Sequence, residues 1–190
     1  NLNGGIRTVT VNNGTTGVRT TTVGGIISNG GLAVLATGTG AAKTSLILTG
    51  ANAYADGSTV NANATLATST TGTFGTGDVT VADTGKLTLG NATSFFDSAK
   101  LTFASTSTAS SISLNFTGTD TLGAVYDSIS STYLASGTYT ASQLNSYFSS
   151  SVFTGTGSLM VAAIPESSTC AAIFGALALG AVVIARRRRA

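Results

Sequence analysis

Short bursts of alternating polar and apolar residues recur along the chain up to about residue 116. Each burst is three to six residues long and is bounded by Gly, Asn or Asp. Such period-two alternation places the apolar side chains on one face of an extended strand, and Thr and Val favour that backbone. The pattern therefore predicts short β-strands separated by tight turns. They are expected at residues 6–11, 18–23, 32–35, 46–48, 79–81, 87–89, 101–103 and 112–116.

Two pairs of apolar residues repeat within this region with the same internal spacing. Val60 precedes Leu66 by six residues, and Val81 precedes Leu87 by six as well. A strand pair that recurs about every 20 residues, as this one does, fits one coil of a β-solenoid. Each coil of such a fold buries its apolar side chains against its neighbours, so several coils are needed for stability.

A third pair, Ile26 and Leu32, keeps the same six-residue spacing upstream. The sequence therefore predicts an all-β fold with a parallel β-helix (β-solenoid) over residues 1–103. A β-sandwich is the alternative, because it too uses short strands at regular spacing.

Residues 104–163 differ from the preceding region in composition and hydrophobic pattern. They begin with a run of Ser, Thr and Ala at 105–111 and end with an apolar-rich strand at 158–161. We expect this region to be a small β-rich cap that closes one end of the solenoid, because an uncovered sheet edge invites pairing with other chains.

One short helix is expected within the cap. Thr140 is a candidate N-cap, and Gln143 follows three residues later, which is the spacing of a capping box. Leu144, Tyr147 and Phe148 then share one helical face at positions i, i+3 and i+4.

Residues 45–66 resemble the autotransporter-associated β-strand repeat. The stretch reads Leu-x-Leu-x-Gly-x-Asn-x-Tyr, followed by Gly-x-Thr-Val-Asn-Ala and Thr-Leu. Asn63 stands where the repeat usually has Gly, and Asn tolerates the left-handed backbone that Gly would adopt. The resemblance implies a parallel β-helix from a large exported surface protein, with residues 1–103 as the C-terminal part of a longer repeat region.

The C-terminal segment 164–190 combines an apolar run with a basic cluster. No charged residue occurs from Ser167 to Ala185, and 19 helical residues span roughly 28 Å, close to the ~30 Å hydrocarbon core of a bilayer. Arg186, Arg187, Arg188 and Arg189 follow and are expected to stay in the cytoplasm. The segment therefore predicts a C-terminal transmembrane helix. Its expected span residues are Ser168, Cys170, Ile173, Phe174, Leu177, Leu179, Val182, Val183 and Ile184.

The arrangement of Ile164, Pro165, Glu166 and Ser167 before this span resembles a PEP-CTERM sorting signal. Ser167 stands where that family usually has a second proline. The resemblance implies an exported precursor that is anchored in the inner membrane with a cytoplasmic C-terminus. It also implies that an exosortase-type membrane protease processes the chain near Pro165 and Glu166.

The amino-acid composition limits the kinds of binding site and catalysis that the chain can have. Without the four terminal arginines, the chain has five basic and seven acidic residues, a net charge of −2. This excludes a basic patch for nucleic acid. Histidine is absent and Cys170 is the only cysteine, so His-dependent catalysis and Cys or His metal sites are excluded. No cofactor is expected.

The aspartates and tyrosines are dispersed in the sequence. Asp78 and Asp97 are separated by nearly the length of one repeat and could lie one coil apart, but isolated aspartates beside Gly and Thr are more typical of exposed turns. With no Trp and five scattered tyrosines, the sequence offers no visible aromatic platform.

These features predict a non-enzymatic structural protein of the cell surface or extracellular matrix. The expected partners are the inner membrane, the exosortase-type protease, and exopolysaccharide or other surface proteins. The alternatives are a carbohydrate-binding or carbohydrate-active β-helix protein, and an adhesin. Three or more acids or aromatic platforms gathered on one solenoid face would favour the carbohydrate alternative.

Overall fold

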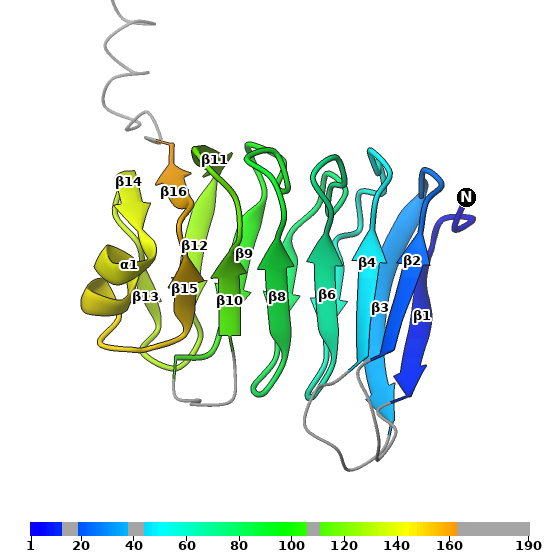
Figure 1. The fold of residues 1–190 in the computed structure, drawn as a ribbon, viewed down its shortest axis with the longest axis horizontal. Helices are drawn as coiled ribbons and strands as arrows, with labels where there is room; N and C mark the ends of the chain where they lie inside the picture. Colours follow the sequence, from blue (N-terminus) through cyan, green and yellow to red (C-terminus); the bar gives the residue numbers. More distant parts are fainter. Residues whose placement is uncertain (13–18, 38–43, 106–110, 163–190) are drawn as a thin grey trace, which may run out of the picture.

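The computed structural model describes residues 1–12, 19–37, 44–105 and 111–162. The chain winds into a β-solenoid in which two parallel sheets face each other (Figure 1). Successive turns contribute one strand to each sheet, so strands that are neighbours in a sheet are one turn apart in sequence. The strands pair in parallel across the turns, and the β-sandwich alternative is therefore wrong.

Sheet 1 has seven strands in the described part of the chain, in the spatial order β1, β3, β5, β7, β9, β12, β13. All neighbours pair in parallel except β12 and β13, which form an antiparallel pair. The strands are Gly5–Asn12 (β1), Gly30–Thr37 (β3), Ser58–Val60 (β5), Val79–Val81 (β7), Lys100–Phe103 (β9), Ala124–Asp127 (β12) and Thr132–Tyr133 (β13).

Sheet 2 has six described strands, all paired in parallel, in the order β15, β10, β8, β6, β4, β2. They are Phe153–Gly155 (β15), Ser111–Leu114 (β10), Lys86–Leu89 (β8), Thr65–Thr68 (β6), Thr44–Leu48 (β4) and Arg19–Val23 (β2). β10, β12 and β15 all follow Phe103 in sequence. The predicted division at residue 103 therefore does not coincide with a break in either sheet.

Apolar side chains stack in register between the sheets. In sheet 2, Leu46, Leu66, Leu87, Ile112 and Phe153 are successive partners, and each is at most 2% exposed. Each such side chain contributes about 1.5–3 kcal/mol by leaving water. The period-two alternation of the sequence thus produces ladders in which every turn covers the apolar side chains of the turn before it.

The two repeated pairs found in the sequence are confirmed as equivalent positions of neighbouring turns. Val60 pairs with Val81 in sheet 1, and Leu66 pairs with Leu87 in sheet 2. Asn63, in the turn between β5 and β6, has φ +59°, so it does adopt the left-handed backbone expected of it.

The third pair is wrong. Ile26 is 66% exposed and lies outside the strands, while Leu32 lies in β3 of sheet 1. The positions equivalent to Val60 and Leu66 are Val34 and Leu46. These two are twice as far apart in sequence as Val60 and Leu66, because the connection between the two strands is longer in this turn.

Close packing between turns also requires glycine at some positions. A Cβ on Gly72 would lie 1.9 Å from the carbonyl oxygen of Leu48 in the preceding turn. No side chain fits at that separation, so the backbone of one turn lies directly on the backbone of the next.

At the C-terminal end, a small third sheet and one helix follow the solenoid strands (Figure 1). Sheet 3 joins β11 (Thr119–Leu122), β16 (Ser158–Val161) and β14 (Gly137–Thr140) in that order. Helix α1 (Ala141–Tyr147) contacts β14 and β15. This is the region in which the sequence predicted a cap with one short helix.

The capping box of α1 is confirmed. Gln143 donates its backbone N–H to the Thr140 hydroxyl, and its side-chain oxygen accepts the Thr140 N–H. Leu144 and Phe148 are buried, and the Phe148 ring makes a T-shaped contact with Phe103 in β9, with centroids 5.1 Å apart. Tyr147, predicted on the same face, is instead 43% exposed.

Candidate functional site

The predicted sorting motif, membrane span and basic cluster lie within 163–190, outside the described residues. Among the residues that are described, no helix has the length and apolar character needed to cross a bilayer. The described fold ends at Ala162, whose N–H donates to the Leu122 carbonyl at 3.2 Å. Strand β16 ends at Val161, and Pro165 follows four residues later in the sequence.

The aspartates make separate structural contacts. Asp78 accepts the backbone N–H of Lys100 at 2.8 Å, and its other carboxylate oxygen lies 3.7 Å from the Lys100 ammonium nitrogen. Asp78 thus links the start of β7 to its neighbour β9. Within the described residues, no group of three or more acids, cysteines or histidines is placed to hold a metal ion.

Asp120 and Asp127 correct the expectation of exposed turn aspartates, because they are 1% and 0% exposed. Asp120, in β11, accepts the Phe95 N–H at 3.1 Å through Oδ2, while Oδ1 has no hydrogen-bond partner in the described structure. Burial raises the pKa of Asp120 to about 7. Asp120 therefore holds the turn around Phe95 against sheet 3 from a poorly solvated position.

The carboxylate of Asp127 has more hydrogen-bond partners than that of Asp120. It accepts the backbone N–H groups of Ser105, Ile129 and Ser130 and the Ser130 hydroxyl. Burial alone would raise its pKa, but these hydrogen bonds hold the pKa of Asp127 below its ordinary value. Asp127 thus fixes the turn that joins β12 to β13.

The tyrosines, scattered in the sequence, gather at the C-terminal end of the solenoid. The rings of Tyr126 in β12 and Tyr133 in β13 lie 4.5 Å apart between centroids. The Tyr147 hydroxyl donates to the Tyr133 carbonyl at 3.0 Å, and the Tyr139 ring lies 6.2 Å from the Tyr147 ring. The fifth, Tyr54, is buried and bonds to the Ser58 hydroxyl at 2.6 Å.

Tyr126 and Tyr133 continue a row of hydroxyl side chains on the outer face of sheet 1. Across the sheet, Thr59 pairs with Thr80, Thr80 with Thr102, Thr102 with Tyr126, and Tyr126 with Tyr133. Neighbouring strands lie about 4.8 Å apart. The row therefore places a hydroxyl-bearing side chain on each of β5, β7, β9, β12 and β13, with the two aromatic rings at its end.

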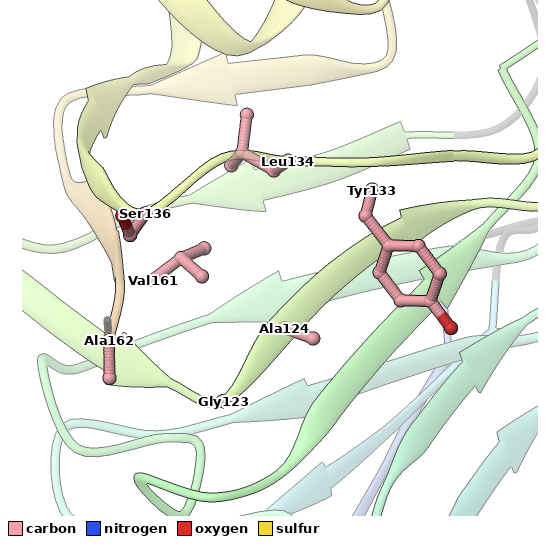
Figure 2. A pocket seen from close by; sticks show the side chains of 7 residues that line it. All are labelled: Gly123, Ala124, Tyr133, Leu134, Ser136, Val161 and Ala162. Carbon is pink, nitrogen blue, oxygen red and sulfur yellow. The ribbon is translucent and has the colours of Figure 1, made fainter. Parts of the chain in front are cut away.

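A pocket of about 250 Å³ opens beside Tyr133 (Figure 2). Its wall includes Ala124, which lies two positions before Tyr126 in β12 and on the same outer face, so the pocket adjoins the pair of rings. Within the described part of the chain, no charged side chain lines it. Its walls are Gly123, Ala124, Tyr133, Leu134, Ser136, Val161 and Ala162.

No family model, curated protein or solved structure matches the chain in comparisons with known proteins.

The pocket and the tyrosine pair were not predicted from the sequence. Tyr126 and Tyr133 are seven residues apart, and they meet only because the chain reverses direction over residues 128–131, between β12 and β13. Predicting that hairpin would have revealed the tyrosine pair, since antiparallel neighbours place facing residues on the same side of a sheet.

Proposed function

We propose that the protein is a non-enzymatic structural protein of the cell surface or extracellular matrix, and that its C-terminal segment sorts it there. In this proposal, residues 168–185 span the inner membrane and Arg186–Arg189 remain in the cytoplasm. An exosortase-type protease processes the chain near Pro165 and Glu166 and releases or transfers the solenoid outward.

The observation that carries the proposal is the position of the sorting motif relative to the fold. Pro165 follows the end of β16 by four residues, and the uncharged run from Ser167 to Ala185 comes directly after the motif. A folded solenoid so close to the membrane segment suits display, because cleavage at the motif would free the whole fold intact.

The solenoid supports a structural role. Its turns are held by in-register apolar ladders and parallel hydrogen bonding, which make an elongated, repetitive scaffold. The acids with contacts described above, Asp78, Asp120 and Asp127, serve strand pairing and turns. A spacer or display surface needs no more chemistry than this.

To test the proposal, Pro165 and Glu166 are both replaced with alanine in cells that make the protein naturally. The wild-type chain is expected to appear shortened at the cell surface or in the matrix, and the variant to remain full-length in the inner membrane. Ser168→Ala, just beyond the motif, serves as the matched control and should be processed as the wild type is. Retention of the intact wild-type chain in the inner membrane would rule out sorting.

A further inference from the structure

We propose that the C-terminal end of sheet 1 binds a neutral polysaccharide, with Tyr126 and Tyr133 as an aromatic platform and the adjoining pocket as the site of one sugar residue. The biological role of this ligand, as the partner of a displayed scaffold, rests on the proposed function. The binding itself depends only on the described residues and can be measured whether or not the protein is sorted.

The platform leaves aromatic surface exposed to solvent. Tyr133 is 56% exposed, and the Tyr126 ring beside it is tilted by 39°. The carbon–hydrogen face of a pyranose ring packs well on an aromatic face, and tyrosine adds a hydroxyl that both donates and accepts hydrogen bonds. With centroids 4.5 Å apart, the two rings cover part of each other's faces, so the exposed side of Tyr133 is left for one sugar ring and Tyr126 supports it from behind.

The platform is held in place by its neighbours. The Tyr147 hydroxyl bonds to the Tyr133 carbonyl, and the Leu134 N–H donates to the Val125 carbonyl at 2.9 Å. Asp127 fixes the intervening turn through its hydrogen bonds to Ile129 and Ser130. A site whose geometry exists before binding loses less entropy when the ligand arrives.

The pocket gives the platform a concave side. Its volume of about 250 Å³ is below the usual range for drug-sized ligands and suits a single monosaccharide unit. Leu134 and Val161 supply apolar wall and Ser136 supplies a hydroxyl (Figure 2).

The lack of charged side chains on the described pocket walls favours a neutral ligand. No charged side chain of the described chain lines the pocket, and the row that leads to it consists of Thr59, Thr80 and Thr102. Lys100 lies opposite Ala124 in the register, but Asp78 balances its charge. A polyhydroxylated chain lying across the strands could exchange hydrogen bonds with this row, whereas an acidic polysaccharide would gain no ion pair from the described pocket walls.

The test uses the full 190-residue chain in a detergent without a sugar headgroup. Migration in native gels is compared with and without hydroxyethylcellulose, galactomannan or dextran, and with polygalacturonate as the acidic comparison. At least one neutral polysaccharide should retard the protein. Polygalacturonate is expected to bind the Arg186–Arg189 cluster, so any retardation that it causes should be the same in Tyr126→Ala and Tyr133→Ala as in the wild type. Tyr126→Ala and Tyr133→Ala should each weaken binding by roughly tenfold, the loss of about 1.4 kcal/mol.

Two controls separate binding from folding. Phe96→Ala removes an aromatic side chain that is 50% exposed in another turn, and it should leave binding unchanged. Tyr133→Phe keeps the ring and should retain most of the affinity. Because the chain has no Trp, its fluorescence comes from all five tyrosines, and the change on titration that is lost in Tyr126→Ala and Tyr133→Ala reports the platform. Unchanged circular dichroism shows that each variant is folded.

Failure of all three neutral polysaccharides to bind would overturn the proposal. So would neutral-polysaccharide binding that is unchanged in Tyr126→Ala and in Tyr133→Ala, or polygalacturonate binding that these two variants abolish. None of these outcomes bears on the cleavage test. A chain that is sorted but binds no sugar leaves the scaffold function intact, and one that binds sugar but is not sorted leaves the platform intact.

Discussion

At the scale of single residues, Asp120 is a carboxyl group whose ionisation opposes folding. It is 1% exposed, and only one of its oxygens has a hydrogen-bond partner in the described residues. Burial disfavours the charged form and raises the pKa of Asp120 to about 7, well above the ordinary value near 4. Between these two values, the folded chain binds a proton that the unfolded chain does not.

The stability of the protein is therefore expected to fall as pH rises from about 4 to about 7, as far as Asp120 governs it. Asp120→Asn removes the buried charge and keeps an oxygen that can accept the Phe95 N–H. At pH 8 the variant should be more stable than the wild type by about 1–3 kcal/mol, with little difference at pH 4.5. Urea unfolding at both pH values measures this.

Asp127 provides the matched comparison for that experiment. Its carboxylate accepts four hydrogen bonds, and its pKa lies below the ordinary value, so its ionised form favours folding. Asp127→Asn should consequently destabilise the protein at pH 8. An Asp120→Asn variant that is destabilised at pH 8 to the same degree would show that the Asp120 charge is well solvated after all.

The same two residues show what the sequence could not reveal. Both aspartates stand among turn-forming residues, which makes exposure the natural prediction. Their burial depends on β11 and on the β12–β13 hairpin, which lie against turns a full coil earlier in the sequence. The tyrosine pair escaped prediction for a related reason, since sequence spacing does not report pairing across a reversal of the chain.

At the scale of elements, local signals were the most informative. The capping box of α1 was predicted because both of its hydrogen bonds lie within four residues, and the structure contains both. The repeat of Val60 and Leu66 was also predicted, since neighbouring turns there have nearly equal length. The pair of Ile26 and Leu32 was wrongly predicted as a repeat, because the longer connection between β3 and β4 changes the spacing of equivalent residues. A repeat period does not show where such an insertion occurs.

The capping box also predicts how firmly α1 is held. Thr140→Ala removes the hydroxyl that accepts the Gln143 N–H, which should lower the free energy of unfolding by about 1 kcal/mol. Ser142→Ala, an exposed substitution within the same turn, should change it by less than about 0.5 kcal/mol. Thermal unfolding of the two variants provides the comparison, and equal melting temperatures would mean that packing of Leu144 and Phe148 alone holds the helix.

At the scale of the whole molecule, the two ends of the solenoid differ. At the C-terminal end, α1 packs on β14 and β15, and Phe103, Phe148 and Phe153 form one aromatic cluster over the last described turns. At the other end, β1 and β2 are the terminal strands of sheets 1 and 2 in the described structure. In a stack where each turn contacts its neighbours, a substitution in one turn should be felt most strongly in the turns directly beside it.

Substitutions on the two faces of β8 test whether the central turns unfold together. Leu87 is fully buried between Leu66 and Ile112, so Leu87→Ala should cost about 2–5 kcal/mol, whereas Thr88→Ala on the outer face should cost less than about 1 kcal/mol. Because the ladder passes through both neighbouring turns, Leu87→Ala should accelerate amide exchange in β6 and β10 as strongly as in β8. Exchange in β2 should change less, because β6 and β4 lie between β2 and β8 in sheet 2. Acceleration confined to β8 would instead mean that each turn opens independently, and the solenoid would then be a chain of separate units rather than one cooperative body.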